Sequence, residues 1–207
     1  MINNDSVFPL NETIQTINNR RSIRSFTSQE VSDQQINIIL QAANTAPSAH
    51  NQQSWRFIVI KDKKKQELAN LIVANSNKFP RPASTLLRMA ARSISSATVV
   101  IIIVNTGSLI EHGVELFKIE KEMANDFFRT MEIQSSAAAI ENLLLAATAL
   151  GLATVWLGIL FLIKDDVLEF LEEPKGEFMA VVPVGYADKS GLGPKKRSIE
   201  TMIKYLA

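Results

Sequence analysis

Residues 137–158, AAAIENLLLAATALGLATVWLG, hold the pattern that decides the fold. Apolar residues fill the first part of this stretch, and Gly151 follows at a place where helices commonly end. The β-branched and aromatic residues at 154–156 then favour a strand. We therefore predict a helix over about 134–150 that runs directly into a strand over about 153–157.

Residues 143 to 163, which overlap this stretch, carry no charged residue and are long enough to span a bilayer. Three features argue against a membrane span: the break at Gly151, the strand-favouring residues after it, and the absence of a clearly basic flank. A buried helix followed by a buried strand explains the pattern better. We expect no membrane partner.

The predicted 134–150 helix is apolar on almost every face. Such a helix lies in the centre of a large core or in a subunit interface. In a chain of 207 residues an interface is the stronger expectation, and the small alanine side chains allow close approach. We therefore predict an obligate homodimer.

Other segments supply the remaining elements. Ser32 and Gln35 form a capping box, and apolar residues at helical spacing predict a helix that ends near Asn44. A continuous β-branched run over 99–104 predicts a buried strand. The other expected elements are a short helix from Asn11, a strand over 55–60, a helix over about 64–75, helical structure in 107–132, a short helix capped by Asp165 or Asp166, a strand over 178–186 and a short helix from Ser198. Helices and strands are interleaved, which indicates an α/β or α+β class.

Composition excludes several kinds of function. The length predicts a single domain over 1–207, and the net charge of +1 gives no overall field to attract nucleic acid. The chain has no cysteine and two histidines, so we expect no disulfide, no thiolate nucleophile and no metal site. Residues 1–5 lack the basic start of a signal peptide, so we expect a cytoplasmic protein.

Basic residues cluster in two distant places. Arg20, Arg21 and Arg24 stand within five residues, with Ser22 between them. A second cluster, Lys195-Lys196-Arg197, lies far away in sequence. A guanidinium group can bind two phosphate oxygens at once, and it keeps its charge at any working pH. The two clusters predict a phosphate site if the fold brings them together, and solvated surface charge if it does not.

The pattern around these clusters resembles the flavin-dependent nitroreductase family. The resemblance covers residues 20 to 204, and Ser54 stands where the family usually has a proline. The matching segments, in order, are Arg20-Arg-Ser-Ile-Arg24-x-Phe26, Ala46-Pro47-Ser48-x-x-Asn51-x-Gln53-x-Trp55, Asn142-Leu143-x-Leu145-Ala146-Ala147-x-x-Leu150-Gly151, Trp156-x-Gly158, Val182-x-Val184-Gly185-Tyr186 and Lys195-x-Arg197.

This resemblance implies an α+β fold, with a central, mostly antiparallel sheet flanked by helices, in an intertwined homodimer. It implies one FMN in each of two interface pockets. The implied contacts are Arg20, Ser22, Lys195 and Arg197 to the FMN phosphate, Arg24 toward the pyrimidine edge of the ring, main-chain groups of Leu157 and Gly158 near flavin N5, and Pro47, Ser48 and Asn51 from the other subunit. Arg21 also matches the cofactor-binding motif, without an assigned contact.

The resemblance further implies an oxidoreductase in which FMN N5 carries the chemistry and no protein side chain is catalytic. NADH or NADPH would reduce the flavin, and a nitroaromatic, quinone or related small acceptor would then be reduced in a ping-pong mechanism. Residues 107–132 match no family motif, and we expect them to form a variable, lid-like segment. The alternatives are reductive dehalogenation, flavin breakdown, or FMN binding without turnover.

Overall fold

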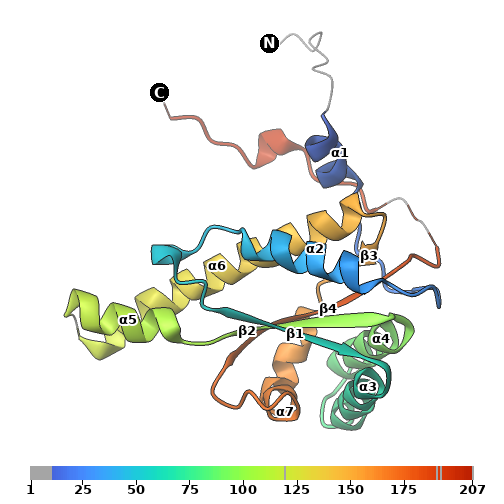
Figure 1. Ribbon diagram of the computed structural model, residues 1–207, viewed down its shortest axis with the longest axis horizontal. Coiled ribbons are helices and arrows are strands. Elements are labelled where there is room, and N and C mark those ends of the chain that lie inside the picture. The colour runs from blue at the N-terminus through green and yellow to red at the C-terminus, as the bar shows by residue number, and fades with distance from the viewer. Residues whose placement is uncertain (1–10, 119, 190, 192, 207) are drawn as a thin grey trace.

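A four-stranded antiparallel sheet forms the centre of the molecule, in the strand order β1-β2-β4-β3 (Figure 1). The computed structural model describes residues 11–118, 120–189, 191 and 193–206. The strands are β1 (Trp55–Lys61), β2 (Val99–Asn105), β3 (Ala153–Thr154) and β4 (Glu177–Gly185). The predicted α+β class with a mostly antiparallel sheet is confirmed. The expectation of no leader peptide falls on residues 1–5, which lie outside the described residues.

Helices cover both faces of this sheet (Figure 1). The alternating residues Val99, Ile101 and Ile103 of β2 pack on one side, and their neighbours in the strand pack on the other. Successive side chains of a strand point to opposite faces, so a strand that is covered on both faces needs an unbroken apolar run. The helices are α2 (Asp33–Asn44) and α6 (Lys121–Ala149) on the first face, and α3 (Asp62–Ser76), α4 (Ala83–Ser96), α7 (Lys164–Phe170) and the 3₁₀ segment η2 (Gly158–Ile163) on the second.

The capping box of α2 is confirmed, because the Ser32 hydroxyl accepts the Gln35 amide and the Gln35 side chain accepts the Ser32 amide. Several boundaries were predicted wrongly. Helix α6 begins at Lys121 and not near 134, β3 ends at Thr154, and α7 begins at Lys164, so Asp165 and Asp166 lie inside its first turn. The expected terminal helix is a single 3₁₀ turn, η3 (Ile199–Thr201). Helix α4 was not predicted.

The second half of α6 is the predicted apolar helix. Its residues Ala139, Ile140 and Leu143 are fully buried against the sheet and α2. The side-chain Nδ2 of Asn142 donates to the Ala42 carbonyl at 3.2 Å. Its opposite side is less covered, since Ala149 is exposed there. In the described part of the chain, no helix is both long and apolar enough to cross a bilayer.

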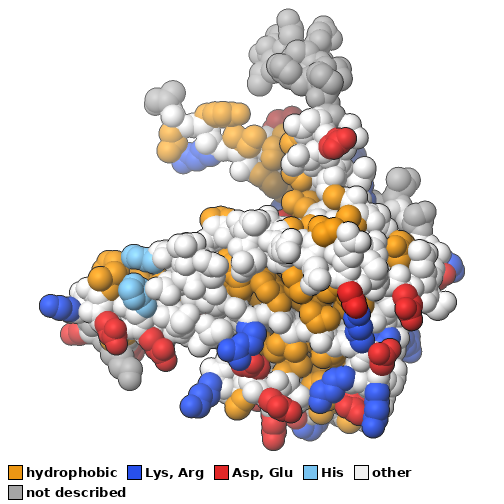
Figure 2. All heavy atoms as spheres, viewed as in Figure 1, with side chains coloured by type: hydrophobic (Ala, Val, Ile, Leu, Met, Phe, Trp, Pro, Cys, Tyr) orange, Lys and Arg blue, Asp and Glu red, His pale blue; other side chains and the backbone are white. Residues whose placement is uncertain are grey.

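Two segments project from the body of the molecule on the same side: α1 (Glu12–Asn19) and the C-terminal arm, which we define as residues 198–206 (Figure 1). Helix α1 has no buried residue although Ile14 and Ile17 form an apolar side. In the arm, Tyr205 and Leu206 are more than four-fifths exposed. Figure 2 shows hydrophobic side chains on both projections. Exposed apolar side chains that gather in one place are typical of interaction sites.

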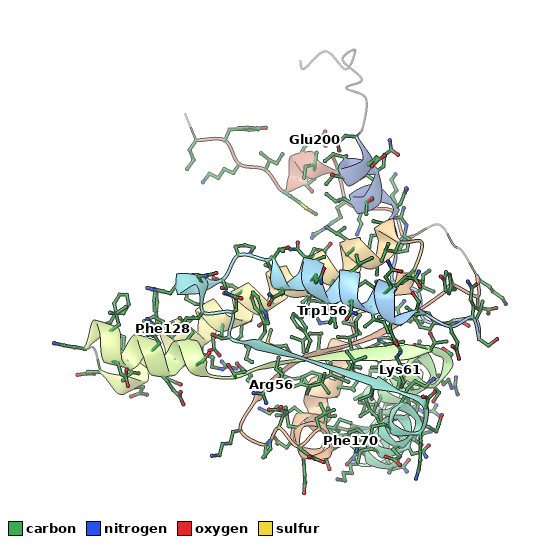
Figure 3. The ribbon with its side chains drawn as sticks, in the orientation of Figure 1. Arg56, Lys61, Phe128, Trp156, Phe170 and Glu200 are labelled. Atoms are coloured by element: carbon green, nitrogen blue, oxygen red, sulfur yellow. The ribbon has the colours of Figure 1, made fainter. Side chains whose placement is uncertain are left out.

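Residues 107–132 fold into α5 (Ser108–Phe117) and the first turns of α6. A small cluster of Leu109, Ala124 and Phe128 joins the two helices at the end of the molecule where Figure 3 labels Phe128. Gly113 allows this contact, because a Cβ there would stand 2.2 Å from the Phe128 ring. Phe128 therefore packs between helices, while Phe117 and Phe127 remain about half exposed.

Candidate functional site

The arginine-rich segment is extended and is held against the end of the sheet. The Ile23 amide donates to the Thr154 carbonyl of β3 at 2.9 Å, and the Thr27 amide donates to the Tyr186 carbonyl after β4, also at 2.9 Å. Phe26 is buried in the core at the same place. Successive side chains of an extended chain point to opposite sides. The side chains of Ser22 and Arg24 therefore lie on the side opposite that of Ile23.

This segment and the tail after β4 line an open cavity of about 930 Å³, which we call the arginine cavity. The tail returns beside the arginines: the Asp188 amide donates to the Ser25 carbonyl at 3.1 Å, and a Cβ on Gly193 would come within 2.8 Å of the Arg21 side chain. The lining residues are Ile17, Asn18, Arg20, Arg21, Ser22, Ile23, Arg24, Ser25, Glu141, Lys189, Gly191, Gly193, Pro194 and Lys196. The fold therefore brings the two distant basic clusters to one cavity.

The structure distributes the expected phosphate ligands unevenly. Arg20 and Ser22 line the cavity together with Lys196, which the sequence motif does not single out. Lys195 and Arg197 are exposed beside Lys196 and are not among the lining residues. The contact of Lys195 and Arg197 with a phosphate stays a prediction.

The cavity also contains one carboxylate. Glu141 of α6 lies 3.6 Å from the Arg20 guanidinium, and about half of the Glu141 side chain is exposed. Arg21 donates to the main-chain carbonyls of Asn18 and Arg20, at 2.5 and 2.8 Å. Arg21 thus stabilises the turn between α1 and the extended segment, and it is Arg20 that faces an acid.

A second pocket, of about 160 Å³, shares the lining residue Arg24 with the first. Arg24 lines both, and in the second pocket it meets Trp156, Leu157 and Gly158. Leu157 is held in place because its amide donates to the Val181 carbonyl of β4 at 2.9 Å. Trp156 is about one-third exposed and contributes to this wall. Two of the segments expected to face a flavin ring are therefore adjacent.

The far wall of the second pocket comes from α4, through Leu86, Met89, Ala90 and Ser93. Sequence reasoning missed this helix and therefore missed the wall. A signal was present, since Leu87, Ala90, Ala91 and Ile94 follow helical spacing and are buried. It also missed Glu141 as a lining residue, and within the second basic cluster it named Lys195 and Arg197 as the cofactor contacts and not Lys196.

Pro47, Ser48 and Asn51 lie elsewhere, around the short 3₁₀ segment η1 (Ala49–Asn51). Within this loop, the Ser48 hydroxyl accepts the Gln53 amide at 3.1 Å, and the Asn51 side chain accepts from the Gln53 side chain at 3.1 Å. Figure 1 shows η1 at one end of α2 and β3 at the other. Pro47, Ser48 and Asn51 are not among the residues that line the arginine cavity or the second pocket of their own chain.

Comparisons with known proteins show the family to which this fold belongs. Residues 17–186 match the model of the nitroreductase family, and the chain belongs to that family. It is 30% identical over 182 residues to the "Putative NADH dehydrogenase/NAD(P)H nitroreductase" of Archaeoglobus fulgidus, covering 86% of each chain. It is 27% identical over 189 residues to the "FMN reductase [NAD(P)H]" of Bacillus subtilis, covering 90% of this chain and 70% of the relative.

Solved structures give the same result. A crystal structure from Desulfovibrio desulfuricans, described as a "putative nitroreductase in complex with fmn", superimposes with a TM-score of 0.70. It is 27% identical to this chain, and the match covers 96% of this chain and 99% of the other. The resemblance noted from the sequence is confirmed at the level of the family and the fold.

Proposed function

We propose that this protein is an FMN-dependent oxidoreductase that takes its electrons from NADH or NADPH. The observation that carries the proposal is the position of Arg24, which lines both the arginine cavity and the smaller pocket at Leu157 and Gly158. A ligand that is anionic at one end and flat at the other fits two spaces that meet at one arginine side chain. The FMN-bound relative and the FMN reductase support the choice of FMN.

The residues of the first cavity fit a phosphate. Arg20, Ser22 and Lys196 supply two cations and a hydroxyl, and hydrogen bonds from charged donors to phosphate are about twice as strong as neutral ones. Glu141 forms an ion pair with Arg20, which would itself bind the phosphate. Glu141 therefore positions that guanidinium and reduces the net positive charge of the cavity. Lys195 and Arg197 complete the proposed phosphate site.

The second pocket fits one edge of the flavin ring. When bound, FMN supplies reversible two-electron chemistry at N5, and the protein tunes that chemistry by the charge placed near the ring. Arg24 would face the N1–C2=O edge and favour the reduced, anionic flavin. Main-chain groups of Leu157 and Gly158 would hold the ring near N5, so no acid–base side chain is required.

The active form is proposed to be a homodimer. Helix α1 and the C-terminal arm carry apolar side chains that the chain itself leaves uncovered. A second copy would cover them, and it would also bring Pro47, Ser48 and Asn51 to a cavity that they do not reach within one chain. The proposed site is therefore incomplete without the partner.

We further propose that nitroaromatics, quinones or related small acceptors react at the exposed face of the flavin, and that residues 107–132 act as the lid over them. One site would then serve NAD(P)H and acceptor in turn, which predicts ping-pong kinetics. These substrates are compatible with a site whose second pocket is mostly apolar. The lid and the pocket walls belong to the single domain expected over 1–207.

We expect the FMN-loaded protein to lose its yellow colour when NADH or NADPH is added without oxygen, and to regain it when menadione is added. The measurement is flavin absorbance in an anaerobic cuvette, followed by initial rates over a grid of both substrate concentrations. Parallel double-reciprocal lines support the ping-pong proposal, and intersecting lines contradict it. Bound FMN that neither reductant bleaches would favour FMN binding without turnover.

A further inference from the structure

A carboxyl group outside the proposed flavin site is buried where α5 meets α6. Glu132 of α6 is 1% exposed. Its Oε1 accepts the Leu109 amide at 2.9 Å, while its Oε2 is buried with no hydrogen-bond partner among the described residues. A buried carboxyl group is energetically unfavourable and needs an explanation in the structure.

The start of α5 explains one role for this carboxyl group. The N-cap position of α5 is Gly107, which has no side chain to accept the first amides of the helix, and its φ is 81°. The Leu109 amide is one of those first amides, so Glu132 replaces the missing cap from a neighbouring helix. The positive end of the helix dipole also favours an acidic group at this place.

Further contacts connect α5 and the start of α6 to the loop 47–53 and to Ser54 after it. The Ser108 hydroxyl donates to the Ser54 hydroxyl at 3.1 Å, and the Ala49 amide donates to the Ser135 hydroxyl at 3.2 Å. The His50 ring packs against Phe117 of α5, with 5.8 Å between ring centroids. Helix α5, the start of α6 and this loop are therefore joined.

This loop is strained and depends on such support. His50, Asn51 and Gln53 all have positive φ, at 54°, 54° and 49°. Residues other than glycine rarely adopt this conformation, and the surrounding structure must hold them in it. A change in the position of α5 would therefore reach Asn51 through the packing of His50.

We propose that Glu132 is a positioning residue for the acceptor site: it caps α5 and so holds α5 and the loop 47–53 together as one wall of that site. The inference rests on the proposed function, in which this loop enters the flavin site of the partner and residues 107–132 cover the acceptor. It assigns a specific task to a side chain that touches neither flavin nor acceptor.

The electrostatic surroundings give a second readout. Burial raises the pKa of Glu132 above its ordinary value, and the negative charge of Glu177 in β4 also raises it. The Leu109 and Gly107 amides and the Ser54 hydroxyl lower this pKa, but burial has the larger effect. Glu177 itself is paired with Arg129 of α6, at 2.5 and 2.7 Å.

A raised folded-state pKa fixes the sign of the pH dependence. Protonated Glu132 contributes stability that is fully present below the unfolded value of about 4.5, and this contribution is lost as pH rises through the folded pKa. Glu132→Gln cannot ionise at this position. The melting temperature of Glu132→Gln minus that of the wild type should therefore increase as pH rises above 4.5.

The test compares FMN-loaded wild type with Glu132→Ala, Glu132→Gln and the control Glu169→Ala, which changes an exposed residue of α7 outside both pockets. Glu132→Ala should speed amide hydrogen exchange in 108–117 by about five- to tenfold, because the cap is lost, and should raise the KM for menadione by a similar factor. The amide oxygen of glutamine still accepts the Leu109 amide, so Glu132→Gln should stay within about twofold of the wild type in both measurements. Glu169→Ala should change neither the exchange in 108–117 nor the KM for menadione.

Each other result contradicts part of the account. Unchanged exchange in 108–117 would overturn the capping role, and faster exchange with unchanged KM would leave Glu132 a purely structural residue and overturn the positioning role. If Glu132→Ala does not fold, Glu132→Asp, which is one carbon too short to reach Leu109, takes its place with the same expectations. Wild-type protein that takes up no FMN would overturn the proposed function, while exchange in α5 would still test the capping separately.

Discussion

Replacing Arg20 and Lys196 together by alanine is expected to weaken FMN binding by about 10²- to 10⁴-fold. Each residue supplies a charged donor to the proposed phosphate site, and such a hydrogen bond contributes about 1.5–3 kcal/mol. Every 1.4 kcal/mol changes a dissociation constant about tenfold. Riboflavin lacks the phosphate, so its affinity should barely change. Quenching of flavin fluorescence by the apo protein measures both affinities.

The matched control removes two positive charges elsewhere. Lys63 and Lys78 are solvent-exposed and lie outside both pockets, so the Lys63→Ala, Lys78→Ala variant should bind FMN like the wild type. An equal loss of FMN and riboflavin in the Arg20, Lys196 variant would mean that these residues act on the ring or on the fold. Unchanged FMN affinity would show that the phosphate does not bind in this cavity.

Truncation after Ser198 is expected to dissociate the homodimer and to release most of its FMN. The deleted segment carries five apolar side chains that are at least two-fifths exposed in the single chain: Ile199, Met202, Ile203, Tyr205 and Leu206. Burying a large apolar side chain contributes about 1.5–3 kcal/mol, so removing several should weaken dimerisation by at least about 10³-fold. Light scattering should report twice the 22.9 kDa chain mass for the wild type and a single chain mass for the truncated protein.

The fold of the single chain should survive this truncation, because the deleted side chains contribute nothing to its buried core. Far-UV circular dichroism checks that point. A truncated protein that remains dimeric and keeps its FMN would show that the arm is not part of the interface. A monomeric wild type with FMN bound would contradict the homodimer and the role of Pro47, Ser48 and Asn51 from the partner.

Features that depend on local sequence were predicted well. The capping box at Ser32 and Gln35 is a pattern of four residues. The apolar run of β2 indicates a strand that is covered on both faces. The arginine cluster at 20–24 also stands out without any structure. In each case the residues that create the feature are neighbours in the chain.

Features that depend on the path of the chain in three dimensions could not be predicted. Whether Lys195, Lys196 or Arg197 faces the cavity depends on how the tail passes Arg21, which no local pattern records. The start of α6 was misplaced because its first turns pack on α5, so the apolar face changes along the helix. Glu132 was not noticed because its partner Leu109 precedes it by 23 residues.

The central claim is that one phosphorylated flavin occupies the space between Arg20 and Gly158 in each chain. Equilibrium titration of the wild-type apo protein with FMN and with riboflavin, followed by absorbance and by protein mass, tests it most directly. We expect one FMN per chain and an affinity for FMN at least about 10²-fold higher than for riboflavin. No uptake of FMN, or equal affinity for both flavins, would contradict it.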